Sequence, residues 1–226
     1  MNQQRAPLKL TPPKESSQPS DELAPLHIKP SIELYLGVPG SGKTYLLKER
    51  LRRLLDESGA TFEVDSDGDV ISYEGPAVYV FTPTNEWGKL LDTVPIAKFN
   101  PTIEELKDYP FLRFDSPQEL FRHAKPDTIV VIEEMLCIPE RDHGIIQQAS
   151  ATHRHEGLFL MVSTQRPRCV PRATIALANR IFLFRLSDAE DGKAIKHLLT
   201  PEQIRRVPSL KRGQYVELRP GIDTKS

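Results

Sequence analysis

The chain has 226 residues and is nearly neutral, with 30 Lys and Arg residues against 31 Asp and Glu residues. Near neutrality excludes a uniformly basic nucleic-acid coat but not a local basic patch. No apolar run approaches the ~18 residues of a membrane span, and the first residues lack the apolar stretch of a secretory signal. Cys137 and Cys169 lie far apart in the sequence, which argues against a disulfide framework or a zinc site.

The first 30 residues differ from the rest in composition. They contain six of the chain's 20 prolines, spaced among Ser, Gln, Lys and Glu, and few large apolar residues. Such a segment buries too little apolar surface to offset its ordering entropy, so we predict a flexible, proline-rich arm over 1–30. A partner-binding arm is the alternative. We expect one folded domain over 31–219 and a polar tail over 220–226.

From Ser31 onward, short apolar runs alternate with segments of helical periodicity. The apolar runs predict strands at 32–36, 77–82, 111–114, 129–132, 158–163, 181–186 and 214–218. The periodic segments predict helices at 44–58, 117–124, 142–155, 188–199 and 201–207. An alternating stretch over 61–73 predicts a small β-hairpin that turns at Asp67-Gly68. This order predicts an α/β fold with a mainly parallel sheet flanked by helices on both faces.

The first predicted strand leads into a complete GxxxxGK[ST] motif that opens the first predicted helix. Strand, glycine-rich loop and helix in this order are the context of a phosphate-binding loop. Glycines let backbone N–H groups approach a polyphosphate at the helix N-terminus, which favours negative charge. The predicted nucleotide-binding residues are Gly37, Val38, Pro39, Gly40, Ser41, Gly42, Lys43, Thr44 and the adjacent Tyr45. Lys43 would reach the β- and γ-phosphates of ATP, and the Thr44 hydroxyl would bind Mg²⁺.

The predicted strand at 129–132 ends in two acids, Glu133 and Glu134. A buried strand that ends in a carboxylate is what a Walker B element requires downstream of a phosphate-binding loop. We assign Glu133 to Mg²⁺ and Glu134 to the general base that polarises the attacking water. Most Walker B elements have Asp at the first position, so the longer Glu133 departs from the usual pattern.

A polar residue, Gln165, follows the predicted strand at 158–163. In nucleotidases with a second Walker B acid, an additional strand lies between the strands that carry the phosphate-binding loop and the acids. Its carboxyl end points at the γ-phosphate, so we expect 158–163 to take this place. The neutral amide of Gln165 donates and accepts hydrogen bonds, so it can sense the γ-phosphate or the attacking water. A plain polar strand cap is the alternative.

Several segments in this order carry a family resemblance. GVPGSGKT (37–44), VVIEE (130–134), HRHEG (153–157) and STQRP (163–167) resemble the FtsK–HerA group of DNA-translocating ATPases, as do ANRIFLFRLSDAED (178–191) and LKRGQYVEL (210–218). The resemblance covers residues 31–219 and implies a RecA-like P-loop NTPase fold of the additional-strand type that uses ATP and Mg²⁺.

Within this group, a short chain with little beyond the ATPase core resembles the genome-packaging ATPases of tailless, membrane-containing dsDNA viruses such as tectiviruses. The HRHEG stretch also resembles the Zot-type assembly ATPases of filamentous phages. Those normally carry a membrane segment, for which this sequence has no candidate.

The resemblance implies action as a ring, commonly a hexamer, with ATP at the subunit interfaces. A cation from the neighbouring subunit would then stabilise the charge of the transition state. Arg154 in HRHEG matches the arginine that this group places before the sensor strand, and we predict that it is this arginine finger. Arg180 and Arg166 are the alternative fingers. Arg154 could instead have a structural role only, as a cation that interacts with the dipole at the C-terminus of its own helix.

Residues 157–185 contain five arginines and no acid, which makes a local basic segment inside a neutral chain. Such clusters bind phosphates without reading sequence. The predicted contacts to double-stranded DNA are Arg166, Arg168 and Arg172, in a proline-punctuated loop after Gln165. A solvated basic loop or intersubunit salt bridges are the alternative.

Together these features predict an ATP-hydrolysing translocase that packages viral double-stranded DNA into a preformed capsid. Its implied partners are DNA of any sequence, copies of itself, and capsid, portal-vertex or membrane proteins. Its expected location is the host cytoplasm during assembly or the packaging vertex of the virion. The alternatives are a Zot-like morphogenesis ATPase, a cellular FtsK- or HerA-type translocase, and a P-loop protein that binds nucleotide as a switch without turnover.

Overall fold

A single large sheet forms the centre of the molecule. The structure, a computed structural model, describes residues 28–64, 66, 70–83, 98–99 and 111–220. The sheet has eight strands in the order β10-β9-β1-β8-β7-β4-β6-β5, and all neighbours are parallel except β9 and β10. Its strands are β1 (Ser31–Leu36), β4 (Val78–Phe81), β5 (Lys98–Phe99), β6 (Phe111–Phe114), β7 (Ile129–Ile132), β8 (Phe159–Thr164), β9 (Arg180–Leu183) and β10 (Val216–Leu218).

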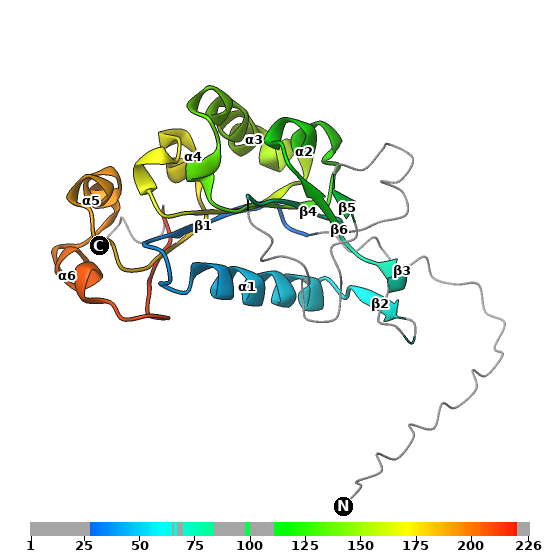
Figure 1. Ribbon diagram of the computed structural model, residues 1–226, viewed down its shortest axis with the longest axis horizontal. Helices are drawn as coiled ribbons and strands as arrows, with labels where there is room; N and C mark the ends of the chain where they lie inside the picture. Colours follow the sequence, from blue (N-terminus) through cyan, green and yellow to red (C-terminus); the bar gives the residue numbers. More distant parts are fainter. Residues whose placement is uncertain (1–27, 65, 67–69, 84–97, 100–110, 221–226) are drawn as a thin grey trace, which may run out of the picture.

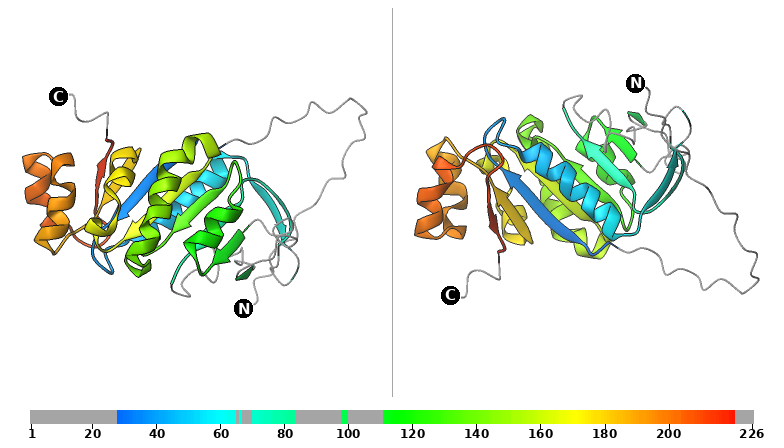
Figure 2. Two further views of the ribbon diagram at one scale, coloured as in Figure 1. Left: turned by 90° about the horizontal axis from the view of Figure 1, so that it is seen from above. Right: turned by 90° about the horizontal axis from the view of Figure 1, so that it is seen from below.

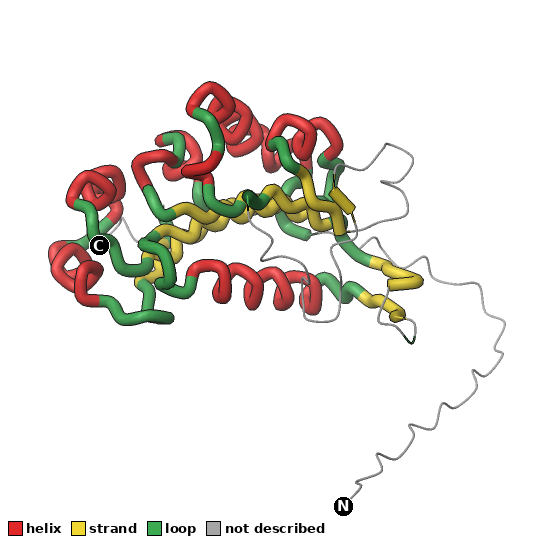
Figure 3. The backbone as a smooth tube through the Cα atoms, viewed as in Figure 1, coloured by secondary structure: helices red, strands yellow, loops and turns green. Residues whose placement is uncertain are grey.

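Helices cover both faces of this sheet, as Figures 1 and 3 show. α1 (Lys43–Glu57) lies on one face, and α2 (Pro117–His123), α3 (His143–Glu156) and α4 (Arg172–Leu177) lie on the other. Two short helices, α5 (Ala189–Ile195) and α6 (Pro201–Arg206), lie beyond the β10 end of the sheet (Figure 2). A separate hairpin of β2 (Thr61–Val64) and β3 (Val70–Glu74) lies at the other end.

The central strands are buried on both faces, which explains their continuous apolar sequences. Leu34 of β1 belongs to the core cluster that contains Ile146 of α3. The next residue, Tyr35, belongs to the opposite cluster with Leu51 of α1. Successive side chains of a strand point to opposite faces, so a strand between two helical layers needs apolar residues at every position.

This architecture confirms the predicted α/β fold, its parallel sheet and the β2–β3 hairpin. Three details differ from the expectation. The predicted helix at 188–199 divides into α5 and a 3₁₀ turn (Lys196–Leu198), and the strand predicted at 181–186 leaves the sheet after Leu183. Two elements, β5 and α4, were not predicted. The turn at Asp67-Gly68 and most of the predicted arm and tail lie outside the described residues.

The placement of Arg172 in a loop is wrong, because Arg172 is the first residue of α4. Arg166 and Arg168 lie at a 3₁₀ turn (Pro167–Cys169) between β8 and α4. Pro171 comes directly before α4, where a proline is compatible with the start of a helix. The basic segment is therefore more ordered than its prolines suggest.

Candidate active site

The glycine-rich loop connects β1 to α1 at the carboxyl edge of the parallel strands. The Gly37 amide donates to the carbonyl of Thr164 at the end of β8, at 3.2 Å. The Val38 amide donates to the carbonyl of Arg185 after β9, at 3.0 Å. The loop is therefore fixed to the chain at the ends of both strands that flank β1.

Two glycines of the loop occupy places that other residues fit poorly. Gly42 is the N-cap of α1 and has a φ of 105°, a conformation that side chains disfavour. A Cβ atom at Gly37 would lie 2.6 Å from the Cβ of Phe184. A Cβ atom at Gly40 would meet nothing within 4 Å, so the turn at Pro39 and Gly40 faces open space, but the φ of 67° at Gly40 also disfavours a side chain.

Two polar side chains of the loop are buried. Among the described residues the Ser41 hydroxyl finds no hydrogen-bond partner. The Lys43 ammonium donates to the Val38 carbonyl at 3.1 Å. Burial lowers the pKa of Lys43, whereas the carboxylates of Glu134 and Glu133 act in the opposite direction. A buried cation and an unsatisfied hydroxyl at a helix N-terminus are suited to a polyanionic ligand.

Glu133, the first residue after β7, reaches the first turn of α1. One of its carboxylate oxygens accepts a hydrogen bond from the Thr44 hydroxyl at 2.7 Å. The other accepts one from the Thr82 hydroxyl at 2.9 Å. Sequence analysis missed Thr82, because nothing in a single threonine after a strand distinguishes it from other strand ends.

The oxygen donors of Thr44 and Glu133 fit Mg²⁺, which prefers hard oxygen ligands. In the described part of the chain, no group of three or more His, Cys, Asp or Glu side chains could hold a metal ion. Mg²⁺ that is bound through one carboxylate and substrate phosphates needs no such group. The residues present therefore match a Mg²⁺–nucleotide site.

Glu134 is held on the other side of β7 from Glu133. Its backbone is left-handed, with a φ of 55° and a ψ of 69°. Its Oε1 accepts hydrogen bonds from the main-chain N–H of Gln165 at 3.1 Å and from the Thr164 hydroxyl at 3.3 Å. Glu133 is thus held from the β4 side and Glu134 from the β8 side. A partly exposed carboxylate beside a phosphate-binding loop can act as a general base.

The strand that ends before Gln165 has the predicted place in the sheet, since β8 lies between β1 and β7. Gln165 is half-buried at its carboxyl end, between the glycine-rich loop and the two acids. Its backbone is tied to Glu134, so these two residues are positioned together. The structure therefore brings all the predicted residues from Gly37 to Thr44, both acids and Gln165 to one edge of the sheet.

A loop before β10 contacts the glycine-rich loop and was not predicted as part of the site. Its Gly213 amide donates to the Ser41 carbonyl at 2.9 Å. Tyr215 follows and packs on Phe184, with 5.5 Å between ring centroids. Tyr45, in the first turn of α1, is 79% exposed. It makes no ring contact among the described residues, so its predicted contact with nucleotide stays a prediction.

Arg154 lies apart from these residues. α3 runs from the carboxyl end of β7 back to the start of β8, and Arg154 is exposed in its last turn. The Gly157 carbonyl after this helix accepts a hydrogen bond from the Asp127 amide, which precedes β7. Arg154 is therefore at the edge of the sheet opposite the glycine-rich loop of its own chain.

The two alternative finger residues are ion-paired within the chain. Arg180 pairs with Glu33 at 3.4 Å and Glu217 at 2.9 Å. Arg166 pairs with Asp188 at 2.5 Å and with the buried Asp191 at 3.4 Å. Of the three arginines, Arg154 is the one that forms no ion pair within the described residues.

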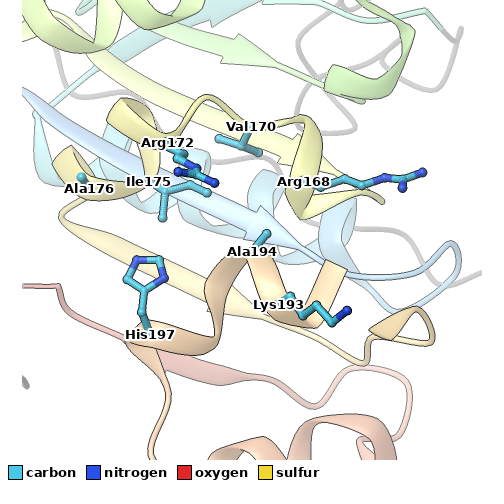
Figure 4. A pocket seen from close by; sticks show the side chains of 8 residues that line it. All are labelled: Arg168, Val170, Arg172, Ile175, Ala176, Lys193, Ala194 and His197. Atoms are coloured by element: carbon cyan, nitrogen blue, oxygen red, sulfur yellow. The ribbon is translucent and has the colours of Figure 1, made fainter. Parts of the chain in front are cut away.

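The basic segment at 157–185 is partly neutralised by acids that follow it in the sequence. Arg168 shares Asp191 with Arg166, at 4.0 Å. Arg172 forms no ion pair within the described residues. Arg168 and Arg172 also line a cavity of about 490 Å³ between α4 and α5 (Figure 4). Its lining consists of Arg168, Val170, Arg172, Ile175, Ala176, Lys193, Ala194 and His197.

The cavity combines an apolar lining with basic side chains. In Figure 4, Arg168 and Lys193 extend to the same side of it, one from each wall. Lys193 and His197 come from the α5 segment, outside the sequence stretch that we predicted to be basic. The fold therefore places Lys193 and His197, which are distant in sequence, next to Arg168 and Arg172.

Solved structures with a similar fold include a genome packaging NTPase. The genome packaging NTPase B204 from Sulfolobus turreted icosahedral virus 2, in complex with ATPγS, matches with a TM-score of 0.64 and 18% identity over 86% of this chain and 94% of that chain. VirB4 of Thermoanaerobacter pseudethanolicus matches with a TM-score of 0.57 and 14% identity, over 84% of this chain and 87% of that one.

The conjugation coupling protein TcpA of pCW3 matches with a TM-score of 0.51 and 15% identity, over 86% of this chain and 58% of that one. A scan of protein-family models finds no match to this chain, and a search of curated proteins finds none either. Among the described helices, none has the length and apolar character to cross a membrane. These structural matches, together with the mostly parallel sheet flanked by helices, show that the chain has a RecA-like P-loop NTPase fold.

Proposed function

We propose that this chain is an ATPase that drives double-stranded DNA into a preformed viral capsid, as a ring with ATP at its subunit interfaces. The observation that supports ATP hydrolysis is the placement of two separately held acids, Glu133 and Glu134, beside the phosphate-binding loop. Packaging is favoured by the structural likeness to B204, which extends over 94% of that chain. The HRHEG and STQRP segments support the same group.

In the proposed reaction, the loop amides and Lys43 hold the β- and γ-phosphates. Thr44 and Glu133 would hold Mg²⁺, which supplies charge neutralisation at the phosphates when it is bound. Glu134 accepts a proton from the attacking water, and Gln165 orients that water or the γ-phosphate. Because the main-chain N–H of Gln165 donates to Glu134, a shift of either residue is transmitted to the other.

A path from the site toward DNA starts at the next residue. Arg166 follows Gln165 and pairs with Asp188 and Asp191, at the start of α5 and within it. α5 forms one wall of the cavity that Arg168 and Arg172 line. In this proposal, movement at Gln165 on hydrolysis shifts that cavity and the DNA phosphates bound at its rim.

The ATPase activity is tested with the full chain and two site variants. We expect Lys43→Ala to lose binding of a fluorescent ATP analogue, because the ammonium is the cation of the loop. We expect Glu134→Gln to keep this binding and to lose about 10²–10⁴-fold in kcat, the usual contribution of a general base. Lys125→Ala and Glu202→Gln are matched controls, because both residues are exposed and distant from the loop in sequence.

Nucleotide binding with no turnover in the wild type, with or without DNA, would favour the nucleotide switch instead. The DNA part is tested by the ATPase rate with linear double-stranded DNA of unrelated sequences. We expect every DNA sequence to stimulate the ATPase rate. For DNA binding, we expect Arg172→Ala to reduce by about one the magnitude of the slope of log DNA affinity against log salt concentration. The control Arg122→Ala changes an exposed residue of α2 and should leave this slope unchanged. Stimulation confined to one sequence would argue against packaging.

A further inference from the structure

Thr82 is a buried polar residue that contacts the site but belongs to none of the sequence motifs. It follows β4, is 2% exposed, and directs its hydroxyl to Glu133. Resting on the function proposed above, we propose that Thr82 is a positioning residue that locks Glu133 in the orientation needed for Mg²⁺.

The backbone around Thr82 is fixed from both sides. The Glu133 amide donates to the Phe81 carbonyl at 2.9 Å, which continues the pairing of β7 with β4. The Arg113 guanidinium from β6 donates to the Thr82 carbonyl at 3.3 Å. With its main chain held by both neighbouring strands, Thr82 presents its hydroxyl at a defined place.

The Thr82 hydroxyl contacts the carboxylate oxygen of Glu133 that does not face Thr44. Thr44 donates to Oε1 of Glu133, and Thr82 donates to Oε2. With both oxygens engaged, the carboxylate can neither rotate nor swing away from α1. A glutamate needs this restraint more than an aspartate does, because it has one more rotatable bond to fix. Thr82 thereby compensates for the unusual Glu at the first Walker B position.

Glu134, the second acid, has a similar contact with a different threonine. Thr164 at the end of β8 donates to Glu134, as Thr82 beyond β4 donates to Glu133. β8 and β4 are the two neighbours of β7 in the sheet. Each acid therefore has a threonine from a different adjacent strand, and loss of either hydroxyl should affect a different step.

The test measures metal affinity directly, by the electron paramagnetic resonance signal of free Mn²⁺ titrated into the full chain with ATPγS. We expect Thr82→Val to weaken Mn²⁺ binding by about 10–100-fold, the usual effect of losing a residue that orients a metal ligand. Thr82→Ser keeps the hydroxyl and should bind Mn²⁺ as the wild type does. Thr164→Val should keep Mn²⁺ affinity while it lowers kcat.

Thr174→Val is the matched control, because Thr174 is equally buried but pairs with Ser150 between α3 and α4. Urea unfolding without nucleotide checks that each variant is folded. Wild-type Mn²⁺ affinity in a folded Thr82→Val protein would overturn the inference, as would equal losses in the Val and Ser variants. A wild type that binds neither ATPγS nor Mn²⁺ would instead overturn the proposed function itself, and the inference with it.

Discussion

The backbone of Glu134 directs the carboxylates of two consecutive acids to different places. Only two non-glycine residues of the described chain have a positive φ, Asp127 and Glu134. A left-handed residue with a Cβ atom costs roughly 1–2 kcal/mol relative to the right-handed form. Here it ends β7 and places the second carboxylate beside β8 while the first stays beside α1. The local strain thus separates the two carboxylates, to which the proposed reaction gives the Mg²⁺ and the base roles, and such strain is often found at functional sites.

A buried histidine makes stability depend on pH. His153 of α3 is 2% exposed, and its Nδ1 lies 2.8 Å from the Ser150 carbonyl, so Nδ1 carries the proton. Burial lowers the pKa of the His153 imidazole and the Arg154 charge lowers it further, while the bond to Ser150 opposes this. As pH falls below about 6.5, unfolded His153 takes up a proton that the folded form resists, so the free energy of unfolding should fall.

We expect His153→Asn to flatten this dependence between roughly pH 7.5 and 5.5, measured by urea unfolding at several pH values. His155→Asn is the control, because His155 lies two residues along the same helix and is exposed. An equal flattening by both variants would contradict the assignment to His153.

At the scale of elements, the sequence predicted the helices and strands that have a clear apolar periodicity. It did not predict the short elements and the contacts that depend on the tertiary fold. The leucines of α1 and the apolar run of β7 were sufficient to place both elements. α4 has six residues and β5 has two, which is too short for either period to be recognised. The motif residues of the site were found because their chemistry fixes their spacing. Thr82 and the acids that pair with Arg166 were not, because they come from distant parts of the sequence.

One buried charge network joins α1 to the sheet. Glu33 of β1 is 1% exposed and accepts hydrogen bonds from Arg50, at 2.8 Å, and from Tyr35, at 2.6 Å. Arg180 of β9 pairs with the same carboxylate. Removing one partner of a buried pair leaves an uncompensated charge, which is more costly than losing an exposed pair. This network holds the helix that starts at the phosphate-binding loop.

We expect Arg50→Ala to lower the free energy of unfolding by about 3 kcal/mol, the low end for a buried pair, because Arg180 remains near Glu33. Arg53→Ala on the same helix is the matched control. Its side chain is 58% exposed and pairs with Glu49, so we expect a loss below about 1 kcal/mol. Urea unfolding at neutral pH compares the two, and equal losses would show that the Glu33 network contributes no more than a surface pair.

At the scale of the whole molecule, the charge pattern bears on the proposed assembly. The acid-free stretch at 157–185 suggested a free basic surface, yet the fold pairs Arg166 and Arg168 with acids of α5 and Arg180 with Glu33 and Glu217. Their partners lie 22 or more residues away, so the sequence could not show the pairing. Of the five arginines of this stretch, Arg172 and Arg185 form no ion pair within the described chain, and neither does Arg154 just before it.

The position of Arg154 makes a specific prediction about assembly. Arg154 lies at the edge of the sheet opposite the glycine-rich loop, so in the proposed ring it could complete an ATP site only in a neighbouring subunit. Lys43→Ala subunits keep Arg154 but lack a working loop, and Arg154→Ala subunits keep the loop but lack the arginine. Each variant alone should therefore be inactive, because every one of its sites lacks one part. When the two are co-expressed in equal amounts, sites between an Arg154→Ala loop and a Lys43→Ala arginine should be complete. Random assembly then restores about a quarter of the wild-type ATPase rate.

Mixing Lys43→Ala with Glu134→Gln is the control for this recovery. Both changes damage the same side of the interface, so no arrangement of these subunits makes a complete site, and we expect no recovery. Mass photometry verifies that each mixture forms the same assembly as the wild type. If the first mixture assembles and stays inactive, Arg154 is not the residue that acts across the interface. Recovery in the first mixture and not in the second requires a site that two subunits share, because neither variant contains all of its parts.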